Sequence, residues 1–304
     1  MHRKTTVAHV VGLGMCGRKR AARVLGVARS TCYRSRQCSP QHQHSEALVV
    51  QVSQEHPTLG ARKVAALVAQ EHELVVNHKR VARLRRVHGI RASRRGHKRR
   101  RVAVGCQERH TARQRDEVWS YDFIEDATVD GRKVRLLSLI DEHSRECLLL
   151  EAARSFPAVR VIDCLERLLV TTGRTPKHLR SDNGPEFIAK EVRQWLKLAG
   201  VNTAYIDPGA PWQNGHVESF HASLRSELLD RELFFDLEEV QAMAGDWRAF
   251  YNHRRPHGAL GYQPPVRRQQ EAALQASASL QPSTTHPAGQ QTHSPLNPQP
   301  NAAD

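Results

Sequence analysis

Residues 117–126, Glu-Val-Trp-Ser-Tyr-Asp-Phe-Ile-Glu-Asp, alternate in the way that is typical of a β-strand with two different faces. Ser120 and Asp122 are expected on one face. The aromatic side chains are expected on the other face: Trp119, Tyr121 and Phe123. A carboxylate inside such a strand is unfavourable unless another group or a cation compensates its charge. Asp122 is therefore the first candidate for a functional residue.

The segments that follow this strand predict a mixed α/β domain. Four more strands are expected, at residues 134–140, 147–150, 178–181 and 201–206. Amphipathic helices are expected at residues 159–170 and 214–228. Strands and helices in this order favour a sheet that is covered by helices.

Two further carboxylates lie where this domain would bring them to the sheet. Asp182 directly follows the strand at residues 178–181, and a ligand at the carboxyl end of a strand is well placed to hold a cation. Glu218 lies at the edge of the apolar stripe of the helix that Asn214 can cap, so it can face the sheet. Taken alone, Asp182 could be a turn residue and Glu218 a surface residue. The combination with Asp122 favours a catalytic site.

Three carboxylates in one pocket suit two magnesium ions, because Mg²⁺ prefers hard oxygen ligands and keeps positions open for phosphate. In such sites the ions lie about 3.5–4 Å apart, and they assist the attacking and the leaving oxygen. Asp122 is expected to bridge the ions, while Asp182 and Glu218 each hold one, and Mn²⁺ could substitute for Mg²⁺. Arg225 lies seven residues after Glu218 on the same helical face, so it is expected to contact the phosphate backbone.

Positive charge is concentrated in the first third of the chain. Residues 1–115 hold 26 Lys or Arg against 5 Asp or Glu, whereas residues 116–304 hold 20 against 26, which gives the net charge of +15. Nucleic acid is the usual partner of such a region, since each neutralised phosphate releases counterions. A solvated basic surface or a ribosomal-type tail is the alternative.

Two helical modules are expected within the basic region. Residues 18–36 have the outline of a helix-turn-helix with its turn at Gly26, although an ordinary helical pair would look similar. A more regular group of helices is expected at residues 45–90, and its last helix begins at Asn77. That helix has a narrow apolar stripe and suits a DNA surface, although a merely solvated helix would share this pattern. Its expected DNA contacts are Lys79, Arg80 and Arg83.

Changes in composition divide the chain into five parts. These are a short basic helix-turn-helix-like segment (1–40), a helical DNA-binding module (41–92), a basic linker (93–115), a catalytic domain (116–268) and a Gln/Pro/Ser-rich tail (269–304). The tail has hardly any large apolar side chains and is expected to be disordered.

Several function classes are disfavoured. The chain has neither an apolar run of membrane-spanning length nor a secretory signal, so a cytoplasmic, nucleoid-associated protein without a membrane partner is expected. Its six cysteines form no Cys-x-x-Cys pair, and no structural zinc is expected. The Gly-x-Ser-x-Gly elbow of serine hydrolases is missing.

With these motifs the sequence resembles a known family, the insertion-sequence DDE transposases, whose core is similar to that of retroviral integrases. The resemblance rests on the 35 residues between Asp182 and Glu218 and on four local motifs. These are Trp119-Ser-Tyr-Asp-Phe, Ser181-Asp-Asn-Gly-Pro-Glu-Phe, Asn214-Gly-His-Val-Glu-Ser-Phe-His and the block from Tyr251 to Pro265. The chain is most similar to the second-frame (OrfB-type) protein of two-frame insertion sequences.

The resemblance implies an RNase H-like fold, a mixed five-stranded sheet with flanking helices, preceded by a small all-α helix-turn-helix region. It implies hydrolysis at the ends of the element and direct attack of the exposed 3′ hydroxyl on target DNA. The expected partners are DNA, further copies of the chain on that DNA, and an upstream-frame (OrfA-type) protein.

Further DNA contacts are expected around this core. The candidates are Asn214, Trp212, Arg254, Arg255 and His257, and packing is the alternative for the last three. Two other functions remain open. A catalytically idle remnant would bind DNA only, and a nuclease of the same fold would cut without joining.

Overall fold

The computed structural model describes residues 3–33, 39–90, 112–181, 189–205 and 214–279. The chain forms two compact units, Met1–Arg99 and Arg100–Asp304. The first unit begins with three short helices that pack on one another: α1 (Arg3–Gly12), α2 (Arg18–Val24) and α3 (Arg29–Tyr33). Gly26, between α2 and α3, has a φ of 61°, a conformation that favours glycine. The helical pair expected around Gly26 is therefore present, and α1 is an additional helix.

A second group of helices follows in the same unit: α4 (Pro40–Glu55), α5 (Ala61–His72) and α6 (His78–Val87). Their apolar stripes form a common core that includes Val49, Leu67 and Val81. Asn77 caps α6 as expected, because its Oδ1 accepts a hydrogen bond from the Lys79 amide at 2.8 Å.

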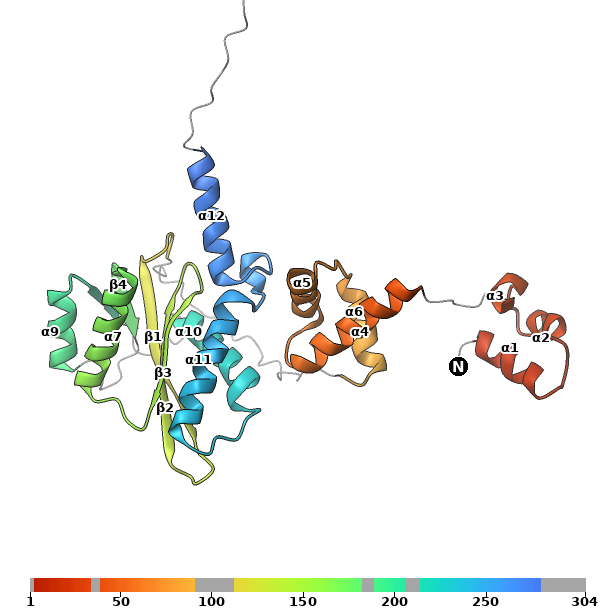
Figure 1. Cartoon of the computed structure of the whole chain (residues 1–304), viewed down its shortest axis with the longest axis horizontal. Helices are drawn as coiled ribbons and strands as arrows, with labels where there is room; N and C mark the ends of the chain where they lie inside the picture. The colour runs from red at the N-terminus through yellow and green to blue at the C-terminus, as the bar shows by residue number, and fades with distance from the viewer. Residues whose placement is uncertain (1–2, 34–38, 91–111, 182–188, 206–213, 280–304) are drawn as a thin grey trace, which may run out of the picture. The chain divides into compact units, whose positions relative to one another are not determined.

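The second unit is built on a five-stranded sheet (Figure 1). Its strands are β1 (Val118–Ala127), β2 (Lys133–Asp141), β3 (Cys147–Ala153), β4 (His178–Ser181) and β5 (Asn202–Tyr205). They lie in the order β3-β2-β1-β4-β5. The β1–β2 and β2–β3 pairs are antiparallel, whereas β1–β4 and β4–β5 are parallel. The mixed five-stranded sheet expected from the sequence is confirmed.

Helices cover both faces of this sheet (Figure 1). On one face, α7 (Ala158–Thr172) and α9 (Lys190–Leu198) pack against a core that includes Trp119 and Tyr121. On the other face, α10 (Gly215–Leu224) and α11 (Leu237–His253) cover a core that includes Ile124 and Ile140. The alternation of β1 thus sends its aromatic side chains to the α7 face and Asp122 to the α10 face.

Two helices differ from the sequence-based expectation. The helix expected to run through Leu228 becomes a π-helix, η2 (Arg225–Leu229), after α10. There the Asp230 amide bonds to the Arg225 carbonyl at 2.7 Å, and Ser226 Oγ bonds back to the Ala222 carbonyl at 3.0 Å, a side-chain bond that bends helices.

The second difference concerns the C-terminal region. The helix α12 (Pro265–Ser279) extends into the tail that was expected to be disordered from residue 269. Its Gln, Glu and Ala residues are good helix formers, so local propensity outweighs the scarcity of large apolar side chains. Residues 280–304 lie outside the described part of the chain.

Candidate active site

Asp122 lies in the middle of β1, on the face that α10 covers, and its side chain is 22% exposed. Ser138 of β2 lies directly opposite Asp122 in the antiparallel pair. One carboxylate oxygen, Oδ1, accepts a hydrogen bond from the Phe123 amide at 2.7 Å. The other oxygen, Oδ2, lies 3.8 Å from Nδ1 of His221. The carboxylate therefore has a defined neighbour on each side.

Glu218 is exposed on α10, which packs against β1 and β2. It lies three residues before His221, and residues three apart are neighbours on one side of a helix. His221 reaches Asp122, so Glu218 lies one turn of α10 before the residue that contacts this carboxylate.

The third predicted ligand, Asp182, lies outside the described residues. The preceding residue, Ser181, ends β4, and β4 is the parallel neighbour of β1 with Arg180 opposite Ser120. Among the described residues, no group of three His, Cys, Asp or Glu side chains is placed to hold a metal ion. Asp122 and Glu218, the two predicted ligands within the described residues, supply only oxygen donors, which is the donor type that Mg²⁺ prefers.

His221 is a neighbour of Asp122 that the sequence motifs contain but that sequence reasoning left without a role. Burial lowers the pKa of its imidazole to about 4, and the nearby Arg225 acts in the same direction. The ring is therefore neutral at pH 7, so one ring nitrogen donates a hydrogen bond and the other accepts one. Its spacing of three residues from Glu218 is the signal that could have identified it.

A buried ionic cluster lies behind Asp122 on the same face of the sheet. Arg180 donates from Nη1 to both carboxylate oxygens of Glu142, at 2.6 and 2.9 Å. The Ser120 hydroxyl donates to the same carboxylate. The Arg180 and Glu142 side chains are 6% and 1% exposed. The cluster connects β1 and β4 to the end of β2. Its member on β1, Ser120, lies two residues before Asp122.

Other acidic residues near the core have structural partners. Asp141 is fully buried and accepts hydrogen bonds from the Ser144 and Asp116 amides, both at 2.7 Å. Glu227 forms a two-fold ion pair with Arg255, with both donor–acceptor distances at 2.6 Å. These contacts account for both carboxylates without a metal.

The expected DNA contacts around the core differ in their accessibility. Arg255 and His257 are only 3% and 8% exposed. Burial of Arg255 against Glu227 favours the packing alternative for it. Asn214 is 4% exposed and, contrary to expectation, its side chain makes no capping hydrogen bond. Arg254 is exposed.

Two more DNA contacts are expected at Trp212 and at Arg225 of η2. Trp212 lies outside the described residues. Arg225 bonds to the Glu125 carbonyl at 2.7 Å and lies 3.7 Å from Asp126, yet its side chain is 42% exposed. The guanidinium is therefore held beside β1 and can still be reached from solvent.

The basic residues of α6 fall into two sets. Arg80 points toward α4, where it bonds to Ser45 Oγ at 2.9 Å, and Arg85 is buried and donates to the Pro57 and Leu59 carbonyls. Lys79, Arg83 and Arg86 are exposed, and their spacing puts them on one side of the helix. Arg80 thus has partners within the helical module, and its DNA contact stays a prediction, whereas Arg86 joins the exposed set.

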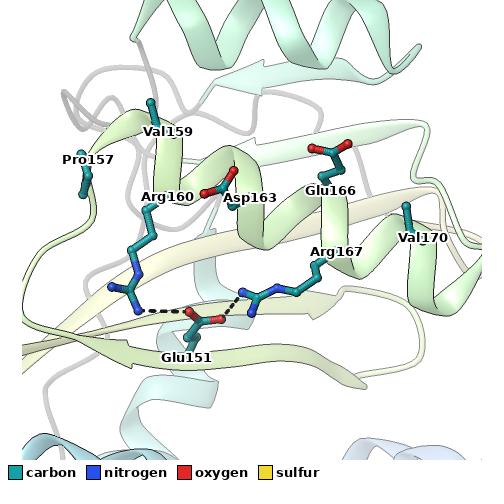
Figure 2. Close-up of a pocket in the computed structure, with 8 residues that line it drawn as sticks. All are labelled: Glu151, Pro157, Val159, Arg160, Asp163, Glu166, Arg167 and Val170. Atoms are coloured by element: carbon teal, nitrogen blue, oxygen red, sulfur yellow. Dashed lines mark hydrogen bonds and ion pairs between the residues drawn. The ribbon is translucent and has the colours of Figure 1, made fainter.

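An open cavity of about 730 Å³ lies on the opposite face of the sheet from Asp122 (Figure 2). Glu151 of β3 reaches across it to Arg160 and Arg167 of α7, at 3.3 and 2.6 Å. The cavity is separated from Asp122 by the sheet, so it is not part of the acidic site. Among the described residues, no helix is long and apolar enough to cross a membrane.

Comparison with known proteins identifies both parts of the chain. Residues 112–211 and 199–265 match two families that are both described as Integrase core domain, and residues 41–98 match the HTH-like domain family. A 31.7 kDa protein of insertion element IS407 from Burkholderia multivorans, described as uncharacterized, is 34% identical over 247 residues, which is 81% of this chain and 88% of that protein.

Two further similarities concern proteins with a named activity. The transposase for insertion sequence element IS629 from Shigella sonnei is 27% identical over 219 residues, which is 69% of this chain and 73% of that protein. The HTLV-2 integrase catalytic core domain, solved in complex with magnesium, is 19% identical with a TM-score of 0.39, and the match covers 51% of this chain and 95% of that chain. The chain belongs to the insertion-sequence transposases of the second-frame type, DDE polynucleotidyl transferases that combine an HTH-like domain with an integrase core domain.

Proposed function

We propose that this transposase cuts and joins DNA at a site where Asp122, Asp182 and Glu218 hold two Mg²⁺ ions. The single observation that carries this proposal is the placement of Asp122 and of the Glu218 helix on one face of the sheet, linked by the 3.8 Å approach of His221 to Asp122. Asp182 enters from the sequence, because it follows β4, the strand beside β1. Mn²⁺ is the expected substitute ion.

Each residue has a distinct part in this site. When bound, the ions activate the attacking oxygen and stabilise the leaving oxygen. Asp122, whose Oδ1 accepts a hydrogen bond from the Phe123 amide, and Glu218 of α10 would hold the ions. Arg225, held by the Glu125 carbonyl, is placed to contact a phosphate of the bound strand. Water is the first nucleophile, at the element end, and the 3′ hydroxyl released there is the second.

The experiment that tests this function uses the full chain with a labelled duplex carrying an element end. With Mg²⁺ it should nick the end and join it to target DNA. The reaction is run once with the chain alone and once with the upstream-frame protein added. End recognition is proposed to involve that partner and several copies of the chain. Binding without cutting in both settings supports the idle remnant, and cutting without joining supports a nuclease.

The exposed side of α6 is proposed as the main DNA contact of the first unit. Replacing Lys79, Arg83 and Arg86 together by Ala is expected to weaken duplex binding for all sequences, because fewer cations are then present to displace counterions from the phosphates. The slope of log affinity against log salt should fall by roughly one for each phosphate that is no longer neutralised. Fluorescence anisotropy at several salt concentrations measures both effects.

Lys197→Ala provides the matched control for this measurement. Lys197 is an exposed cation on α9, which covers the face of the sheet opposite Asp122. Its removal should leave the salt slope unchanged. Equal slopes for the triple variant and the unmodified chain would mean that α6 does not touch phosphates.

A further inference from the structure

Ser138, His221 and Asp122 form a chain of polar contacts on the α10 face of the sheet. Ser138 Oγ lies 2.7 Å from His221 Nε2, and His221 Nδ1 lies 3.8 Å from Asp122 Oδ2. The His221 side chain is 14% exposed, so solvent has little access to the imidazole. The three residues come from β2, α10 and β1, which makes this a tertiary arrangement and not a local turn.

An imidazole with both hydrogens presents Nδ1–H to Asp122 in any case, whereas an imidazole with one hydrogen leaves two arrangements. Ser138 also lies 3.1 Å from the Asp122 carbonyl, and its single hydroxyl hydrogen can point either there or to His221. If it points to the carbonyl, the imidazole must donate from Nε2, and the bare Nδ1 then faces a carboxylate oxygen. Two lone pairs facing each other in a poorly solvated site are repulsive. If the hydroxyl donates to Nε2, the Nδ1 hydrogen faces Asp122 Oδ2, and the contact is attractive.

We infer that His221 is a positioning residue for Asp122: the Ser138 hydroxyl fixes the imidazole so that Nδ1–H directs the Asp122 carboxylate toward the metal site. The inference rests on the proposed function, since it concerns the ligand that both ions would share. The Phe123 amide donates to Oδ1 at 2.7 Å, and His221 Nδ1 faces Oδ2 at 3.8 Å, a distance for electrostatic attraction that is longer than a hydrogen bond. The two contacts together favour one orientation of the carboxylate. Partners behind a metal ligand typically change metal affinity or activity by about 10- to 100-fold when they are removed.

A purely structural role for His221 has a different signature. The ring lies 6.0 Å from that of Phe220, which belongs to the core under α10, so its removal could simply loosen the helix. Leu and Asn have nearly the same shape, but only Asn can donate a hydrogen bond from the position of Nδ1. His221→Leu and His221→Asn therefore form a matched pair that separates packing from hydrogen bonding.

The test compares the full chain with these two variants and with Ser138→Ala. Asp122→Asn serves as the reference, because it removes the carboxylate that is proposed to bind Mg²⁺. Two quantities are measured: the rise in melting temperature on adding Mg²⁺ without DNA, and the Mg²⁺ concentration for half-maximal strand joining. His221→Leu should raise that concentration by about 10- to 100-fold and abolish most of the thermal shift. His221→Asn should recover most of both. Ser138→Ala alone should weaken Mg²⁺ binding. Combined with His221→Asn it should have little further effect, because the shorter Asn side chain does not reach Ser138.

Three outcomes decide between these roles. Unchanged Mg²⁺ dependence in His221→Leu overturns the inference. Equal losses in the Leu and Asn variants, with equally lowered melting temperatures in the absence of Mg²⁺, also overturn it and assign His221 to packing. If the unmodified chain neither joins DNA nor responds to Mg²⁺, the proposed function fails first.

Discussion

Asp122→Asn and Glu218→Gln should each reduce DNA cleavage and joining by at least roughly 10³-fold, because the loss of a metal ligand removes several kcal/mol of transition-state stabilisation. Both changes keep the shape of the side chain and remove only the charge that a divalent cation needs. DNA affinity should change little, since the basic residues lie elsewhere, mainly in residues 1–115. Product formation on labelled DNA in a single turnover, together with anisotropy for binding, measures the two effects. Asp182→Asn is expected to behave in the same way.

Glu191→Gln is the matched control for these variants. Glu191 is exposed on α9, on the opposite face of the sheet, and its change removes the same charge. This variant should retain full activity. Near-normal cleavage by Glu218→Gln would remove Glu218 from the site, whereas a loss of DNA binding in parallel with activity would point to misfolding.

Arg180→Met should lower the free energy of unfolding of the second unit by about 3–5 kcal/mol, because it leaves the Glu142 carboxylate buried without its cation. Glu142→Leu should cost a similar amount for the opposite reason. The double variant should lose less than the sum, since no unpaired charge remains. All four tryptophans follow residue 99, so their fluorescence during urea unfolding reports only on the second unit.

An exposed ion pair provides the comparison. Arg132 and Asp130 pair at the β1–β2 turn with side chains 67% and 42% exposed, so Arg132→Met should cost no more than about 1 kcal/mol. If Arg180→Met is as mild as Arg132→Met, the buried cluster does not hold β1 and β4 together.

The fold and the position of Asp122 on the sheet were predictable because they depend on local patterns. The alternation around Asp122 determined both the strand and the face on which this carboxylate lies. Asn77 indicated the start of α6 for the same reason, since a cap acts on the amides two or three residues later.

Other features depend on partners far away in the sequence. Arg80 and Arg83 are equivalent in charge and both lie on α6, yet only Arg80 meets Ser45, 35 residues earlier. Glu142 and Arg180 are 38 residues apart, and nothing in either segment indicates that they pair. Burial of Arg255 likewise follows from Glu227, which packs against it only in the folded chain. Charge patterns alone could not separate such buried pairs from DNA contacts.

Anomalous diffraction from crystals of the full chain, grown with Mn²⁺ and an element-end duplex, tests the two-metal site most directly. We expect two manganese peaks about 3.5–4 Å apart, both within bonding distance of Asp122 and each with one further ligand from Asp182 or Glu218. Manganese bound elsewhere, or a Glu218 carboxylate that stays turned away from Asp122 with DNA in place, would contradict this assignment.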